Sequence, residues 1–357
     1  MIPGSRYLLI LAVSSLSLWS GGAWTSHVLS RTSPSLVRSH ITKSALATQS
    51  TSRHSVAVVR RSPHPIFHSV TMVTGKVGWG LSATQQVLHT TDSQKSWAVV
   101  SPAHPRVTPL TLTALTTTHA MLIGAPRNLN RSAVVWTTDN VGQHWQTTRL
   151  PGAVSATGAT TYWWSATYGW VFLALEYSNT QKPPPGYPPP DARGIQAVLY
   201  RTVDGGARWT IVPSTTLPNE ANVNDVAFTS VKTGWLLAMT EGPGEPMLYR
   251  TQDGGADWSS VALSVPPALA GPQAEAEPLS RPVFATSQIG AVLTTIEGEP
   301  VVYTTTDGGY RWQWVLLPPS SATISAQYLN WHRSTDGWRL NVLDVQHHVI
   351  AQWVVGA

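Results

Sequence analysis

The stretch of sequence that decides the fold lies between residues 226 and 261. It reads Val226-Ala-Phe-Thr-Ser-Val-Lys-Thr-Gly-Trp235-Leu-Leu-Ala-Met239 and then, after a segment rich in Gly, Pro and Glu, Met247-Leu-Tyr-Arg-Thr251-Gln-Asp253-Gly-Gly-Ala-Asp-Trp258-Ser-Ser-Val261. Short runs of apolar and β-branched residues alternate here with Gly, Pro and Asp turn signals. This pattern predicts a unit of short antiparallel strands, four to the unit.

The closing element of this unit has Thr, Asp and Trp at fixed positions and recurs five times. We number the copies turn one to turn five: Thr90-Thr-Asp92-Ser-Gln-Lys-Ser-Trp97, Thr137-Thr-Asp139-Asn-Val-Gly-Gln-His-Trp145, Thr202-Val-Asp204-Gly-Gly-Ala-Arg-Trp209, Thr251-Gln-Asp253-Gly-Gly-Ala-Asp-Trp258 and Thr305-Thr-Asp307-Gly-Gly-Tyr-Arg-Trp312. Turn one replaces a glycine with Gln94, and turn two is read with one extra residue before Trp145. The aspartates are 47, 65, 49 and 54 residues apart, a spacing that suits one propeller blade each.

The element resembles the Asp-box, or BNR repeat, of β-propellers such as sialidases, sortilin-type receptors and the photosystem II assembly and stability factor. The resemblance covers roughly residues 66–357 and implies a single all-β propeller. An aspartate at such a turn accepts hydrogen bonds from backbone N–H groups, and the glycines supply positive φ. We therefore expect the aspartates and tryptophans of the five turns to be structural rather than catalytic or metal-binding.

A second recurrent element, Gly-Trp, stands on the strand after the innermost one. It occurs at Gly78-Trp79, Gly169-Trp170, Gly234-Trp235 and Gly337-Trp338, and in degenerate form at Ala120-Met121 and Gly290-Ala291. We expect its indoles to pack between blades. The count predicts six four-stranded blades, with seven as the alternative. The last blade lacks a closing element, so we predict that residues 54–61 supply its outer strand and remove an open sheet edge.

The basic excess of the chain lies in its N-terminal third. Residues 1–91 hold eight Lys or Arg and no Asp or Glu, whereas residues 92–357 hold 15 bases against 18 acids. A mostly apolar stretch follows Arg6, as in a signal peptide or a short membrane anchor. We expect residues 1–24 to be that segment, residues 25–53 a flexible Ser/Thr-rich stalk and residues 54–357 a propeller that is extracellular or tethered at the cell surface.

The composition also excludes several kinds of chemistry. A chain without cysteine has no disulfide, thiol nucleophile or Cys-ligated metal. No metalloprotease, calcium-loop, nucleophile-elbow or phosphate-loop motif is present, so we expect neither a metal nor a cofactor. Singly spaced bases without interleaved aromatics do not favour nucleic-acid binding. A sialidase-type glycoside hydrolase is the alternative function, but the chain lacks the Arg-Ile-Pro element of those enzymes.

Two groups of residues are candidates for a binding site. Long loops on a rigid scaffold favour binding, and here they are expected on the face opposite the five turns. The partner-binding candidates on that loop face are Tyr187, Asp191, Arg193, Glu241, Glu245, Glu275, Glu277, Glu297 and Glu299. The candidates for the central channel are Tyr162, Trp164, Asp225, Arg281 and His332. We expect a monomeric, non-catalytic propeller that binds a protein or glycan partner and serves as an assembly scaffold.

Overall fold

The computed structural model describes residues 61–62, 65–103, 107–128, 131–177, 186–187, 190, 194–217, 223–238, 248–271, 276–317, 328–344 and 348–355. The predicted signal or anchor segment, the stalk and residues 54–60 lie outside this set. Among the residues that are described, no helix has the length and apolar character needed to cross a membrane.

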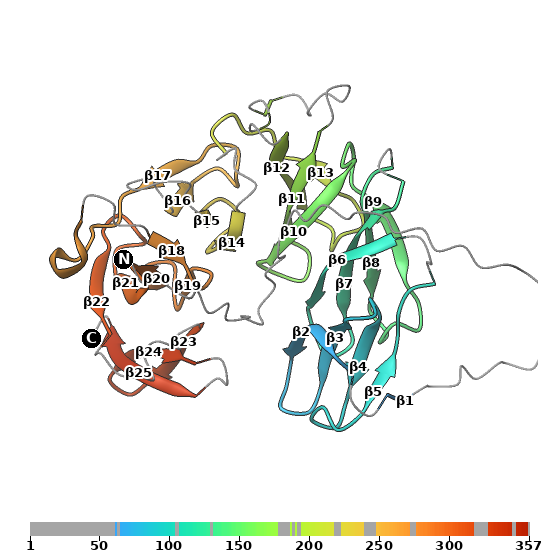
Figure 1. Ribbon diagram of the computed structural model, residues 1–357, viewed down its shortest axis with the longest axis horizontal. Coiled ribbons are helices and arrows are strands. Elements are labelled where there is room, and N and C mark those ends of the chain that lie inside the picture. The colour runs from blue at the N-terminus through green and yellow to red at the C-terminus, as the bar shows by residue number, and fades with distance from the viewer. Residues whose placement is uncertain are drawn as a thin grey trace, which may run out of the picture.

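The protein is all-β, and its six antiparallel sheets lie around a common centre in chain order (Figure 1). Blade one contains β1 (Arg61–Ser62), β2 (Phe67–Met72), β3 (Gly78–Ser82), β4 (Val87–Thr90) and β5 (Trp97–Val99). Blade two contains β6 (Val107–Ala114), β7 (Ala120–Pro126), β8 (Val134–Thr138) and β9 (Gln146–Arg149). Blade three contains β10 (Ala156–Trp163), β11 (Gly169–Glu176), β12 (Ile195–Thr202) and β13 (Thr210–Ile211).

The second half of the ring repeats the plan with variations. Blade four contains β14 (Val223–Phe228), β15 (Gly234–Ala238), β16 (Leu248–Thr251) and β17 (Ser259–Val261), and a short 3-10 helix (Pro267–Leu269) follows it. Blade five contains β18 (Ala276–Pro278), β19 (Val283–Phe284), β20 (Gly290–Ile296), β21 (Glu299–Thr305) and β22 (Gln313–Leu316). Blade six contains β23 (Tyr328–Ser334), β24 (Gly337–Leu343) and β25 (Val349–Val355). The six-bladed propeller predicted from the sequence is confirmed.

The closure of the last blade differs from the prediction. Blade six has the strand order β23-β24-β25 among the described residues. The described end of the segment 54–61 belongs to β1, which pairs with β5 of blade one and places Arg61 opposite Ala98. Its assignment to blade six is therefore wrong for the part that the structure describes. Pairing with a nearby strand closes a much shorter loop than pairing with the far end of the chain, and so costs less conformational entropy.

The glycine of the Gly-Trp element makes room for an aromatic ring of the innermost strand. Gly234 lies directly opposite Phe228, and a Cβ atom at Gly234 would be 2.5 Å from the Phe228 ring. The Phe228 ring lies over Gly234 and fills the space that a side chain at this position would occupy, as aromatic residues do for glycines in other sheets. In blade six Gly337 lies opposite Ser334 across a two-residue turn, so Gly337-Trp338 is not equivalent to the other copies.

Turn four shows how the Thr–Asp–Trp element works. The Thr251 hydroxyl donates to the Asp253 carboxylate at 2.8 Å and accepts from the N–H of Gly255 at 2.9 Å. The same carboxylate accepts from the N–H groups of Ala256 and Asp257 at 2.9 and 3.0 Å. Turns three and five repeat the Thr-to-Asp bond and the N–H bonds from their second glycine and from Arg208 or Arg311. The aspartates of these turns are structural caps, as expected.

Turn two has a different register from the predicted one. Thr138 donates to the side-chain oxygen of Asn140 at 3.0 Å, and that oxygen accepts from the N–H of His144 at 2.9 Å. Asn140 therefore does what aspartate does in the other turns, and Asp139 is not the cap. The turn has no extra residue, because Thr138 precedes Trp145 by the same seven positions that separate Thr251 from Trp258 in turn four.

The two positions after the cap adopt left-handed backbone whatever residue occupies them. In turn four these are Gly254 and Gly255, with φ of 80° and 100°. In turn one they are Ser93 and Gln94, with φ of 61° and 68°, and in turn two the first of them is Val141 with φ of 58°. Hydrogen bonding and packing thus impose a conformation that is unfavourable for residues other than glycine.

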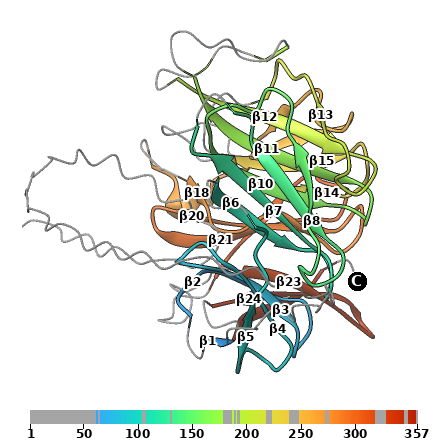
Figure 2. The same cartoon turned by 90° about the vertical axis from the view of Figure 1, so that its right-hand side faces the viewer.

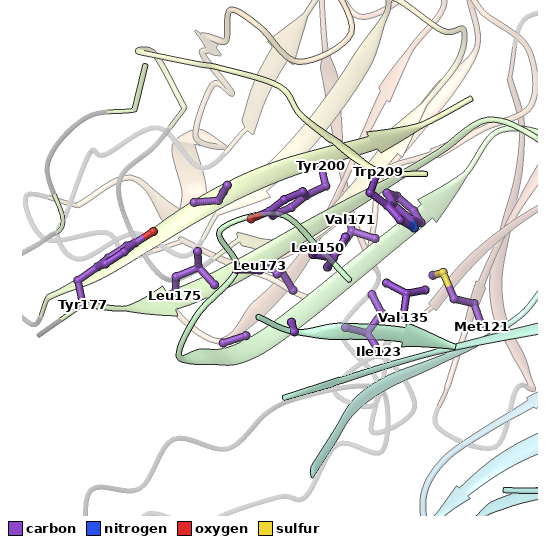
Figure 3. Close-up of a cluster of buried hydrophobic side chains, with 14 residues drawn as sticks. Met121, Ile123, Val135, Leu150, Val171, Leu173, Leu175, Tyr177, Tyr200 and Trp209 are labelled. Atoms are coloured by element: carbon purple, nitrogen blue, oxygen red, sulfur yellow. The ribbon is translucent and has the colours of Figure 1, made fainter. Parts of the chain in front are cut away.

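Buried side chains fill the spaces between neighbouring blades. The cluster in Figure 3 joins blades two and three through Ile123, Val135, Leu173, Tyr200 and Trp209, all at most 4% exposed. The neighbouring strands of these blades are seen from another direction in Figure 2. Gly-Trp indoles also reach across: Trp79 Nε1 donates to the Thr116 carbonyl at 2.9 Å, and Trp170 Nε1 donates to the Gly254 carbonyl at 3.2 Å. The predicted inter-blade packing of these indoles is confirmed.

Candidate functional site

The innermost strand of blade five is interrupted between β18 and β19, and this interruption determines where the positively charged side chain of Arg281 lies. β18 and β19 both pair with β20, but the residues between them leave the ladder. The N–H groups of Leu279 and Ser280 share the carbonyl oxygen of Leu293 at 3.0 and 3.4 Å, and Pro282 has no N–H to donate. A bulge of this kind redirects a side chain. Here the redirected residue is Arg281.

Arg281 reaches from blade five to the innermost strand of blade four. Its Nε atom lies 3.7 Å from Oδ2 of Asp225, and the two side chains are 56% and 23% exposed. The other carboxylate oxygen of Asp225 accepts the N–H of Val226 at 2.9 Å. Burial raises the pKa of Asp225, and the Arg281 charge and the Val226 N–H both oppose that shift. Among the described residues, this contact through Nε is the ion pair that Arg281 forms.

A pocket of about 410 Å³ lies beside Arg281, between blades three, four and five. Its wall on blade three includes the Trp164 side chain, which is 47% exposed. Aromatic rings, aliphatic groups and the hydroxyl groups of two threonines and a serine complete the lining, which consists of Tyr162, Trp164, Ala227, Phe228, Thr229, Arg281, Pro282, Val283, Phe284, Thr286 and Ser287. The pocket therefore combines one cation and several hydroxyl groups with aromatic and aliphatic side chains, and a few polar groups among apolar ones are common in ligand sites.

Contacts between blades hold the pocket walls in place. The Tyr162 hydroxyl donates to the carbonyl oxygen of Phe228 at 2.8 Å and so joins blade three to blade four. The Phe228 ring stacks on Trp170 with 3.7 Å between ring centroids and an interplanar angle of 3°. Phe284 packs in the same way against Trp235, at 5.6 Å and 24°. The part of the pocket that lies on strands is thereby fixed more precisely than a site formed by loops alone.

The pocket opens on the face of the molecule that carries the five turns. Its residues Trp164, Thr229 and Thr286 stand just beyond the ends of β10, β14 and β19, in the turns that lead to the next strand. N–H groups of turns three, four and five bind the carbonyl groups of those same connecting turns, at 3.0 Å for Gly205 to Thr167, 2.8 Å for Gly254 to Lys232 and 2.8 Å for Gly308 to Gln288. The two kinds of turn share a face, and the pocket belongs to it.

Four of the five predicted channel residues come together here. Tyr162, Trp164 and Arg281 line the pocket, and Asp225 binds Arg281. The fifth, His332, lies on β23 of blade six, is exposed and does not line the pocket.

The loop face is described in part. Tyr187, predicted to face a partner, is half-buried: its hydroxyl accepts the Leu199 N–H at 2.9 Å and donates to the Val212 carbonyl. These bonds attach Tyr187 to blade three, and its contact with a partner stays a prediction. The remaining predicted residues of the Pro-rich segment and of blade four lie outside the described residues: Asp191, Arg193, Glu241 and Glu245.

Three acids of the loop face do lie close together. Glu277 lies opposite Thr295 on β20, and Ile296 pairs with both Ala276 and Glu299, which brings Glu277 and Glu299 to the same end of blade five. Glu297 stands in the turn between β20 and β21, and all three carboxylates are exposed. This end of β18 is the one away from the pocket. Glu275, the neighbouring candidate, is outside the part of the chain that is described.

Sequence reasoning missed the hydroxyl side of the pocket. Thr229, Thr286 and Ser287 stand at the start of the five-residue turns between the first and second strands of blades four and five. Their signal was available in the Gly-Trp spacing, because the residues two to five positions before each glycine fall in these turns. The described residues contain no group of three or more His, Asp or Glu placed to hold a metal ion.

Comparisons with known proteins give likenesses of fold. No protein-family model matches the chain, and no curated protein matches it. The solved structure of YCF48 bound to D1 peptide is similar at a TM-score of 0.47 and 10% identity, over 81% of this chain and 79% of that one. YCF48 from Cyanidioschyzon merolae gives 0.45 and 17%, over 80% and 79%. A GH74 xyloglucanase from Xanthomonas campestris gives 0.46 and 13%, over 80% of this chain and 43% of that one. A likeness of fold by itself implies no activity.

Proposed function

We propose that the chain is an exported, non-catalytic β-propeller that binds a segment of a partner protein. The observation that carries the proposal is the pocket where blades three, four and five meet, with the half-exposed Trp164 on its wall. Exposed aromatic side chains next to a well-packed pocket are typical anchor sites for a partner. We therefore propose the binding site on the face of the five turns rather than on the opposite loop face expected from the sequence, and the proposal of export rests on the apolar N-terminal segment.

Photocrosslinking in the native cell tests the binding site. The photoreactive residue p-benzoylphenylalanine replaces Thr286, which is exposed and lines the pocket, in the full chain. The matched control carries it at Ser260, which is exposed on β17, the outer strand of blade four. We expect a discrete protein adduct from position 286 and none from position 260. Equal adducts from both positions, or none from either, contradict the proposal, and a glycan adduct assigns the pocket to a sugar.

Two further measurements address export and catalysis. A tag after Ala357 is expected to be accessible to protease or antibody on intact cells, or to appear in the medium, and a tag that is protected until lysis contradicts export. The purified chain is expected to release nothing from a panel of chromogenic glycosides. Release that Asp225→Asn abolishes would instead support the glycoside hydrolase alternative, because Asp225 is the carboxylate held beside the pocket.

A further inference from the structure

We propose that the pocket recognises a carboxylate that lies next to an aromatic or large apolar side chain, as in an acidic residue flanked by such a residue in the partner segment. This inference rests on the proposed function and adds the chemistry of its ligand. Arg281 would bind the carboxylate, and Trp164 would cover the apolar neighbour.

The contacts and exposure of the Arg281 guanidinium indicate that the ligand carries a carboxylate. Asp225 contacts it at Nε, over 3.7 Å, and the side chain is 56% exposed beside a pocket whose lining contains no other charged residue. The Nη side of a guanidinium is a fork that matches the two oxygens of a carboxylate. Asp225 is a positioning residue here. It holds the guanidinium at Nε and leaves the two Nη atoms for the ligand.

The other side chains that line the pocket indicate that the ligand has an apolar group next to its carboxylate. Trp164 is a large apolar side chain left 47% exposed, whereas the Gly-Trp indole of the same blade, Trp170, is fully buried, and the Trp164 ring lies edge-on to Tyr168 at 6.5 Å. On blades four and five the lining includes two phenylalanine rings and the aliphatic side chains of Pro282 and Val283. A purely polar anion would leave these walls uncovered. A carboxylate with an attached ring or aliphatic group covers them and removes apolar surface from water.

The hydroxyl groups supply the polar contacts that a peptide needs. Thr286 Oγ1 accepts the N–H groups of Gln288 and Ile289 at 3.1 and 3.0 Å, and its hydroxyl hydrogen is free to donate. Ser287 beside it is exposed at the pocket rim. Such groups suit peptide carbonyl oxygens. The same carboxylate chemistry is offered by a free aromatic acid, so the experiment contains an arm for each source.

Fluorescence anisotropy with a labelled peptide tests the inference on the purified full chain. The probe is acetyl-Ser-Gly-Phe-Glu-Gly-Ser-amide, with Glu→Gln and Phe→Ala versions, and 3-phenylpropionate is the competing free acid. We expect Glu→Gln and Arg281→Met each to weaken binding about tenfold to a hundredfold, since each removes a charge-assisted hydrogen-bonded pair. Arg281→Lys keeps the charge without the fork and should fall between Arg281→Met and the parent chain, and Trp164→Ala should abolish the preference for Phe over Ala.

The control is Arg208→Met, which removes the same charge from an exposed position in turn three. It should change the affinity less than twofold, and all variants should unfold at the parent's temperature within a few degrees. Equal weakening by Arg208→Met and Arg281→Met overturns the site, because it indicates a general charge effect. Peptide binding that is indifferent to Glu→Gln overturns the ligand chemistry. Displacement by 3-phenylpropionate at the peptide's own concentration assigns the site to a free aromatic acid.

The outcomes separate this inference from the proposed function. A crosslinked partner at position 286 whose yield is unaffected by Arg281→Met leaves the binding function in place and refutes the carboxylate. The absence of any partner adduct refutes the function, whatever the peptides do.

Discussion

Turn one holds a residue in a conformation that glycine would adopt at lower cost, so Gln94→Gly should stabilise the protein. Gln94 has φ of 68°, and its N–H bond to the Thr90 hydroxyl, at 3.2 Å, comes from the backbone and survives the substitution. Its side chain is exposed. Left-handed backbone costs a residue with a Cβ about 1–2 kcal/mol. Glycine adds about 0.5–1 kcal/mol of unfolded-state entropy, so the net gain in the free energy of unfolding should be about 0.5–1 kcal/mol.

Thermal or urea unfolding followed by circular dichroism measures the effect. The gain corresponds to a rise of about 1–4 °C in Tm for a domain of this size. The matched control is Lys95→Gly, at the next, equally exposed position, where φ is not positive. There the glycine relieves nothing and should lower the stability by about 0.5–1 kcal/mol. If Gln94→Gly lowers the midpoint as Lys95→Gly does, the turn is not strained and the reasoning is refuted.

Three further predictions concern other parts of the fold. Gly309→Ala should cost about 3 kcal/mol in urea unfolding, because φ is 79° and a Cβ there would overlap the Trp235 ring; a loss below about 1 kcal/mol contradicts this. The hydroxyl and N–H of Ser96 lower the pKa of Asp92 to about 2, so its stabilising contribution is present above pH 4 and lost as pH falls towards 2; Asp92→Asn should flatten the pH dependence of Tm in that window and no other. Tyr162→Phe should cost about 1 kcal/mol, and an unchanged midpoint would show that its hydroxyl bond contributes nothing.

Short-range sequence patterns predicted the repeated parts of this structure correctly. The alternation of strand runs and turn residues predicted the six blades. Gly234, which lies opposite Phe228, and the Thr–Asp pair of turn four both make their contacts within a single blade. Those contacts depend on residues a few positions apart, which is why a spacing reveals them. In turn two the neighbouring pairs Thr137-Thr138 and Asp139-Asn140 offered two registers, and the fixed distance to the tryptophan decides between them.

The parts that the sequence did not predict depend on relations between blades. The ion pair of Arg281 with Asp225 joins residues 56 positions apart, and it exists because a bulge redirects the arginine. No periodicity encodes that bulge, although Pro282 and the missing tryptophan after Gly290 mark blade five as irregular. The pairing of β1 with β5 likewise depended on a competition between two open sheet edges, which composition alone does not resolve.

Side-chain hydrogen bonds connect each of several blades to the next blade along the chain. Trp79 joins blade one to blade two, Tyr162 and Trp170 join blade three to blade four, and Trp331 joins blade six to blade five through the Val283 carbonyl at 3.1 Å. A unit of this kind is stabilised mainly by its interfaces with its immediate neighbours, so amide hydrogens of a blade should exchange faster when one of its two interfaces is weakened. The pocket stands on blades three to five. Loosening of the first or last blade would therefore leave the binding site intact.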